Sequence, residues 1–132
     1  MNSRITWGQK SPEAYKAMSA LENAVVNSGL EHALLELIRL RASQLNGCAY
    51  CVNLHANDAR KAGETEARLQ TLSVWAETTF FSEKEKAVLA WTESLTQLSI
   101  HHAPQHQYEA LLEHFSENEV VNITLAIATI NA

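Results

Sequence analysis

Apolar residues recur along this chain at spacings of three and four positions rather than in alternation. Such spacing gathers side chains on one face of an α-helix, whereas alternation would gather them on one face of a strand. The chain holds only four Gly and two Pro, so few positions interrupt helices. The sequence therefore predicts an all-α fold, and no segment has the pattern of a strand.

Capping residues, Gly and Pro set the expected helix boundaries. Ser82 and Ser116 are each followed three positions later by Glu, which is the capping-box pattern that opens a helix. We predict helices at about 12–26, 31–45, 48–62, 64–72, 83–98, 105–115 and 117–132, with a connection at 73–81. The last segment is apolar almost all round, so we expect a central core helix, a subunit contact, or a helix that continues beyond Ala132.

Length and charge narrow the class of protein. A chain of 132 residues fits one domain, 1–132, which needs no disulfides to fold. The net charge is −5 and the basic residues are scattered, which argues against nucleic acid as a partner. No apolar run approaches the roughly 20 residues that span a bilayer, and the N-terminus lacks a signal-peptide core. We therefore expect no membrane contact and a cytoplasmic location, where a close Cys pair is more often catalytic or metal-binding than structural.

Cys48, Cys51 and His55 are spaced three and four positions apart, so in a helix they share one face. Cys48 lies at the expected helix start, where unpaired N–H groups and the helix dipole favour a thiolate. Reduction of a peroxide by a dithiol needs an attacking thiolate, a second thiol and an acid–base group. This segment supplies all three, and helix physics alone favours Cys48 as the nucleophile.

Glu36 lies twelve residues before Cys48 among Leu and Ile side chains. A carboxylate in such surroundings is a candidate for a partly buried acid–base partner, and burial would raise its pKa towards neutrality. The alternative is an exposed helical residue that pairs with Arg39.

Other interpretations of these residues remain open. Cys48, Cys51, His55 and Glu36 could form a four-ligand zinc site, although such ligands usually come from turns rather than one helical face. The two cysteines could also be ordinary small core residues.

Two further clusters of side chains have ordinary explanations. His101, His102 and His106 surround a proline-containing break, and a solvated loop explains them better than a metal site. Four aromatic residues could line a substrate pocket but are more often core; they are Trp75, Phe80, Phe81 and Trp91.

The order Glu36, then Cys48-x-x-Cys51-x-x-x-His55, resembles the signature of the AhpD-like alkylhydroperoxidases within the carboxymuconolactone decarboxylase superfamily. Segments 40–48 and 89–93 also resemble small members of that family. The similarity extends over roughly 11–132.

The resemblance implies an AhpD-like helical bundle that assembles into trimers or hexamers, and a cofactor-free thiol peroxidase or disulfide reductase. It implies that Cys51 is the peroxidatic thiol, Cys48 the resolving thiol, and His55 with Glu36 the proton relay. At Tyr50 the chain departs from the peroxidases of the family, which carry a histidine there, so Tyr50 is a relay or pocket position.

These observations predict an enzyme that reduces an alkyl or hydrogen peroxide through a Cys48–Cys51 disulfide, with a thiol or dithiol reductant as its partner. The alternative is an adaptor or redox sensor that exchanges disulfides without efficient turnover. A lactone decarboxylase or a metal-binding protein is a weaker alternative.

Overall fold

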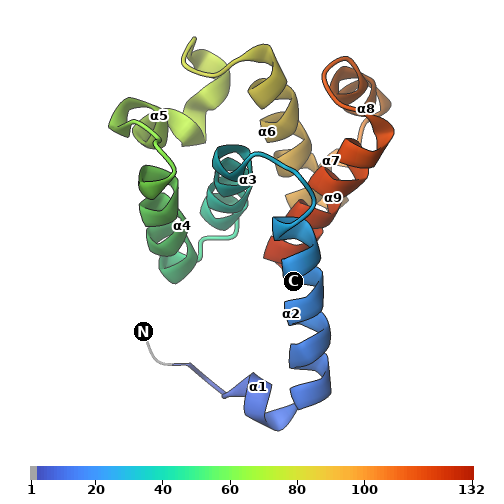
Figure 1. Ribbon diagram of the computed structural model, residues 1–132. Coiled ribbons are helices and arrows are strands. Elements are labelled where there is room, and N and C mark those ends of the chain that lie inside the picture. The colour runs from blue at the N-terminus through green and yellow to red at the C-terminus, as the bar shows by residue number, and fades with distance from the viewer. Residues whose placement is uncertain (1–2) are drawn as a thin grey trace.

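The computed structural model describes residues 3–132 and confirms the all-α class, since this part of the chain contains no strand (Figure 1). The elements follow in the order α1 (Trp7–Lys10), α2 (Pro12–Val26), α3 (His32–Leu45), α4 (Ala49–Lys61), α5 (Glu66–Thr71), the 3₁₀ helix η1 (Leu72–Glu77), α6 (Glu83–Thr96), α7 (Leu98–His101), α8 (Gln105–Leu112) and α9 (Glu117–Asn131). None of these helices is long and apolar enough to cross a bilayer.

Helix α3 occupies the centre of the fold. It packs against α4, α6 and α9, and in Figure 1 it lies between α4 and α6. Every residue from 34 to 40 is buried, including a glutamate and an arginine. The single apolar stripe of a surface helix is therefore an incomplete description of α3, because neighbours cover it on several sides.

Two apolar clusters hold α3 in place. One joins it to α6 and α9 and includes Leu35, Ile38 and Ile123. The other joins α3 to α4, α5 and η1 and includes Leu40, Ala59 and Leu72. This second cluster fixes α4 against α3, and so sets the distance between the side chains that the two helices turn towards each other.

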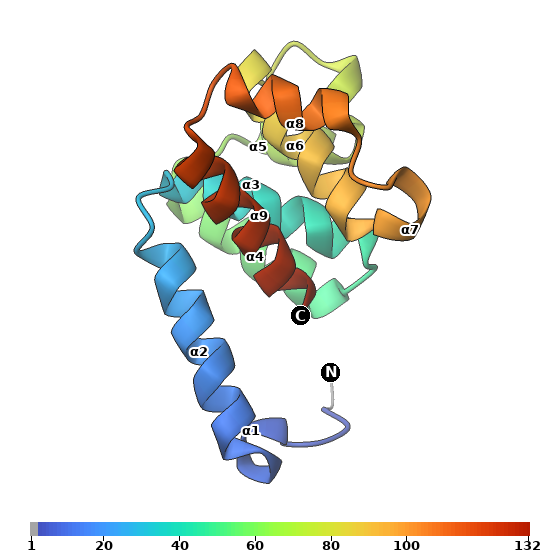
Figure 2. The same ribbon diagram turned by 90° about the vertical axis from the view of Figure 1, so that its right-hand side faces the viewer.

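Helix α2 extends away from the rest of the molecule, with α1 at its far end (Figures 1 and 2). Val25, near the C-terminal end of α2, is its only buried residue. At the other end the rings of Trp7 and Tyr15 contact each other at 5.1 Å between centroids, and both residues are about half exposed. The sequence predicted α2 itself but neither α1 nor this projection from the body.

The predicted boundaries are confirmed to within a few residues. Both capping boxes are formed, at Ser82 and at Ser116. The helix expected to reach 115 ends at Leu112, and the expected connection at 73–81 begins with the 3₁₀ turn of η1. Helix α9 is buried on its inner side, whereas Val121 and Leu125 on its outer side are exposed.

The two clusters that seemed ordinary in the sequence are so in the structure. His101 ends α7, His106 lies in α8 and only His102 lies in the connection between them, and all three histidines are exposed. Phe81 and Trp91 belong to the core. The other two aromatics, Trp75 and Phe80, are partly buried and exposed, respectively.

Candidate redox site

The site begins at the turn that leads into α4. Gly47 has a φ of 65°, a backbone conformation that glycine adopts without strain. Asn46 donates from its side chain to Asn131 Oδ1 at 2.8 Å, which ties this turn to the end of α9. The following residue, Cys48, has extended backbone angles and caps α4: its Sγ accepts the N–H of Cys51 at 3.3 Å. The predicted helix start beside Cys48 is confirmed.

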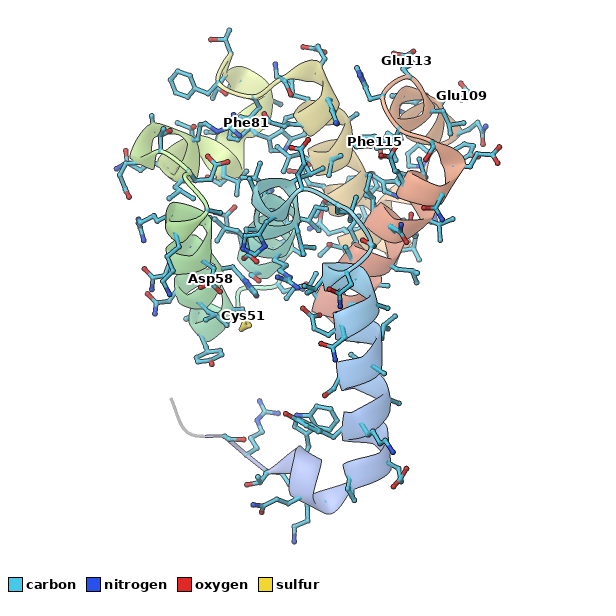
Figure 3. The ribbon with its side chains drawn as sticks, viewed as in Figure 1. Cys51, Asp58, Phe81, Glu109, Glu113 and Phe115 are labelled. Atoms are coloured by element: carbon cyan, nitrogen blue, oxygen red, sulfur yellow. A yellow bond between two sulfur atoms is a disulfide. The ribbon has the colours of Figure 1, made fainter. Side chains whose placement is uncertain are left out.

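Cys48 and Cys51 form a disulfide, with their Cα atoms 5.3 Å apart. Both residues are partly buried. Figure 3 shows Cys51 at one end of α4, where the two sulfur atoms lie. Tyr50, between the two cysteines, is 60% exposed.

Glu36 and His55 meet between α3 and α4. Glu36 is only 1% exposed, and its Oε2 lies 3.0 Å from His55 Nδ1. His55 is four residues after Cys51 and is also buried, so it lies one helical turn from the disulfide on the same face. The structure thus brings Glu36 of α3 to His55 of α4, and it joins Cys48 to Cys51 at the start of α4, one turn before His55.

Arg39 fixes the other oxygen of Glu36. Its Nη1 donates to Glu36 Oε1 at 2.6 Å, and its Nη2 donates to Glu22 of α2. An ionised carboxylate only accepts hydrogen bonds, so with Glu36 ionised, His55 Nδ1 is the donor. In the neutral imidazole this leaves Nε2 with a lone pair that can take a proton.

The expected rise in the pKa of Glu36 is wrong. Burial does raise it, but the hydrogen bonds from His55 and Arg39 and the charge of Arg39 outweigh burial and hold the pKa below the ordinary value of 4.5. Both interpretations of Glu36 made from the sequence hold in part: the residue is buried, and it pairs with Arg39.

Asp58, on the next turn of α4, lies near the same pair. One oxygen of each carboxylate and a ring nitrogen of His55 lie within 4.8 Å of one another. Such a set could in principle hold a cation. However, both oxygens of Glu36 already accept hydrogen bonds, and the adjacent guanidinium of Arg39 opposes a second positive charge.

Sequence reasoning identified the cysteines, His55 and Glu36 but assigned no role in the site to Arg39, Asp58 or Glu22. Arg39 follows Glu36 by three positions and Asp58 follows His55 by three, so the helical spacing that grouped the cysteines could have found them. Glu22 is 17 positions before Arg39 on another helix, and no local pattern indicates it.

Chemically, the arrangement is a dithiol–disulfide pair at a helix N-terminus, followed one turn later by an imidazole that is oriented by a buried carboxylate. The pair can be oxidised and reduced, and an imidazole is a group that can donate and accept protons. A redox role is consistent with every one of these features.

Two known proteins resemble this chain over almost its whole length. The protein ATU0492 of Agrobacterium tumefaciens, of unknown function and suggested to be an antioxidant defence protein AhpD, has a solved structure that matches with a TM-score of 0.93 and 45% identity, over 98% of this chain and 89% of that one. The uncharacterised protein YdfG of Bacillus subtilis is 38% identical over all of this chain and 90% of its own length.

An alkyl hydroperoxide reductase AhpD from Bradyrhizobium sp. is 39% identical over 49 residues, which are 37% of this chain and 27% of that enzyme. The likeness in sequence to this enzyme is therefore confined to a short segment. The carboxymuconolactone decarboxylase family matches residues 12–94, which include both cysteines, His55 and Glu36. The chain is therefore a member of the carboxymuconolactone decarboxylase family, of the AhpD-like kind.

Proposed function

We propose that the protein is a thiol-dependent peroxidase that reduces an alkyl or hydrogen peroxide. The Cys51 thiolate attacks the terminal oxygen of the peroxide, the O–O bond breaks, and the products are a Cys51 sulfenic acid and an alcohol or water. The Cys48 thiol then attacks the Cys51 sulfur, which forms the disulfide and releases water. A dithiol reductant completes the cycle by exchange, and is itself oxidised to a disulfide.

One observation carries this proposal: the Cys48–Cys51 pair lies one turn of α4 before His55, whose Nδ1 bonds the buried carboxylate of Glu36. In the proposed cycle, His55 Nε2 accepts the proton of the Cys51 thiol and returns it to the leaving alkoxide or hydroxide. Glu36 orients the ring and stabilises the imidazolium that forms.

The test uses reduced protein and a stoichiometric amount of hydrogen peroxide or cumene hydroperoxide, with thiols counted by mass spectrometry. We expect the Cys48–Cys51 disulfide to form. Cys48→Ser should stop at a sulfenic acid on Cys51, and Cys51→Ser should abolish the reaction. Unchanged peroxide reactivity in Cys51→Ser would reassign the nucleophile to Cys48, whose Sγ receives the Cys51 N–H at the helix start.

Steady-state turnover separates this enzyme from the alternatives. With excess dithiothreitol or dihydrolipoamide as reductant, a peroxidase consumes many equivalents of peroxide. Oxidation of one equivalent without further consumption would indicate a redox sensor or a disulfide-exchange adaptor instead. If peroxide oxidises neither thiol, the peroxidase proposal fails and a lyase activity is favoured.

We also propose that the protein assembles into a homo-oligomer, a trimer or a hexamer. In support, α2 projects from the body with only Val25 buried, and its exposed residues include Tyr15 and Val26. On α9, Val121 and Leu125 are likewise exposed. Sedimentation equilibrium measures the mass of the particle in solution, and a mass of 14.7 kDa, that of a monomer, would exclude this proposal.

A further inference from the structure

Arg39 is an unusual residue to find in the middle of a core helix. Its side chain is only 10% exposed, and it lies between two carboxylates: Glu36, whose side chain is 1% exposed, and Glu22, whose side chain is 44% exposed. A buried guanidinium is costly unless it is paired, so its presence calls for a role beyond packing.

We propose that Arg39 is a positioning residue of the redox site: it holds Glu36 as a carboxylate whose free Oε2 is a fixed acceptor for His55 Nδ1, while Glu22 of α2 keeps the guanidinium in place. The inference deepens the proposed function, because it matters for the reaction only if His55 exchanges a proton with Cys51. It also makes α2 a part of the site through Glu22.

Without Arg39, Glu36 would no longer be held as a carboxylate. Burial favours the neutral acid, and a protonated Glu36 could turn an O–H towards His55 instead of accepting from it. His55 would then lose the acceptor that keeps a proton on Nδ1. The proton could move to Nε2, which would then be unable to accept the proton of the Cys51 thiol. With Arg39 on Oε1 at 2.6 Å, the carboxylate is the stable form and only Oε2 faces His55.

The charges around this pair come from three helices. Glu22 belongs to α2, Arg39 and Glu36 to α3, and Asp58 to α4 beside His55. Lys61 of α4 lies 3.6 Å from Asp58 and is mostly exposed. Within the part of the chain that the structure describes, Arg39 is thus the only buried cation in direct contact with Glu36.

The test compares Arg39→Gln with Arg41→Gln. Arg41 is a close match, since it lies on the same helix, has a side chain that is 11% exposed, and pairs with a carboxylate, Glu93, at 2.8 Å. Two measurements are made on reduced protein: the titration of the Glu36 carboxyl carbon by ¹³C NMR, assigned with Glu36→Gln, and the rate of Cys51 alkylation by iodoacetamide between pH 5 and 8.

In Arg39→Gln we expect the Glu36 midpoint to rise by at least about 1 pH unit, because a neighbouring opposite charge shifts a carboxyl by roughly 1 to 3 units. The alkylation rate relative to wild type should stay near one at pH 8 and fall towards pH 5, by up to about threefold for a shift of 1 unit, because a growing fraction of Glu36 is then protonated. Arg41→Gln should show neither change. In Arg39→Lys the Glu36 midpoint should rise less than in Arg39→Gln, because lysine keeps the positive charge but lacks the guanidinium fork that reaches both carboxylates.

A purely structural role for Arg39 would lower the alkylation rate by the same factor at every pH, and that result would overturn the proposal. So would an unchanged Glu36 midpoint in both Arg39→Gln and Arg39→Lys, the second variant serving if the first does not fold. In a Glu36→Gln background, removal of Arg39 should cause no further pH-dependent change.

The outcomes also separate this inference from the proposed function. If wild-type protein fails to consume peroxide but Arg39→Gln still shifts Glu36 and the alkylation profile, the peroxidase assignment fails and the positioning role stands. If peroxide is consumed and Arg39→Gln behaves like Arg41→Gln, the positioning role fails alone.

Discussion

Replacement of Arg68 by methionine is expected to destabilise the protein far more than replacement of a surface arginine. Arg68 of α5 donates to both oxygens of Glu64, at 2.7 and 3.0 Å, and to both oxygens of Glu85, at 2.8 and 3.0 Å. It also donates to the Phe80 carbonyl at 2.6 Å and lies 4.6 Å from the centre of the Phe81 ring. One side chain thus fastens α5, the connection after η1 and the start of α6.

The magnitude follows from the burial of the partners. The Glu64 side chain is 6% exposed and that of Glu85 is 25% exposed, so Arg68→Met leaves two carboxylates with little access to water. Breaking a fully buried pair costs roughly 3 to 5 kcal/mol, and since Arg68 is itself 21% exposed we expect the lower end, about 3 kcal/mol at pH 7. Methionine keeps most of the apolar contact of the arginine stem, so the loss is chiefly electrostatic.

The assay is urea unfolding at pH 7 and at pH 4. Burial raises the pKa of Glu85, but hydrogen bonds from Arg68 and Ser82 outweigh this and hold it below 4.5. Without Arg68 the pKa of Glu85 rises, so at pH 4 the Glu85 carboxyl takes up a proton more readily and the penalty should shrink to about half. Arg60→Met is the control, because its pair with Glu66 is exposed and its loss should leave the midpoint unchanged.

An equal loss of stability at pH 7 and pH 4 would refute this reasoning, since it would mean that Arg68 acts through packing rather than charge. A loss in Arg60→Met as large as in Arg68→Met would refute it as well, because the burial of the carboxylates would then be irrelevant.

Three further predictions concern caps, core and pH. Under reducing conditions Cys48→Ala should be about 1 kcal/mol less stable than Cys48→Ser in urea unfolding, since serine keeps a side-chain acceptor at the start of α4; equal stabilities would exclude the cap. Ile123→Ala, at a fully buried position, should cost about 3 kcal/mol, whereas the exposed Val121→Ala on the same helix should cost little; similar losses would contradict the packing of α9. Burial raises the pKa of Glu36 and Glu85, but hydrogen bonds hold both below 4.5, so the stability that they supply is complete above pH 4.5 and is lost as the pH falls through their folded-state values. The urea midpoint should therefore drop between pH 5 and pH 3, and more steeply than in Glu85→Gln; identical slopes would contradict this.

Local features of the structure could be predicted from the sequence because local chemistry determines them. Ser82 and Ser116 each form the predicted capping box, and Cys48 begins α4 as expected. The pairing of Glu36 with His55 was also expected, although only the resemblance to known proteins connected two residues 19 positions apart.

The features that the sequence did not reveal depend on contacts between distant segments. The contact of Glu22 with Arg39 requires the position of α2 relative to α3, which no spacing along the chain encodes. The pKa of Glu36 was expected to rise because most of its neighbours in sequence are aliphatic. It is lowered instead by hydrogen bonds from His55, which the fold brings to it, and from Arg39, one turn along α3. Nothing in the segment of α2 indicates that it projects from the body, because its apolar content is that of an ordinary amphipathic helix.

The buried charges of α3 also limit how this protein can change over evolutionary time. Loss of Glu36 leaves Arg39 with only the half-exposed Glu22, and loss of Arg39 leaves the Glu36 carboxylate with only His55, so each substitution is harmful unless its counterpart is already gone. Glu22 differs, because its side chain is 44% exposed and water can replace it on Arg39. In a lineage that loses these three charges, we therefore expect Glu22 to be replaced first. Glu36 and Arg39 should be replaced later, and together.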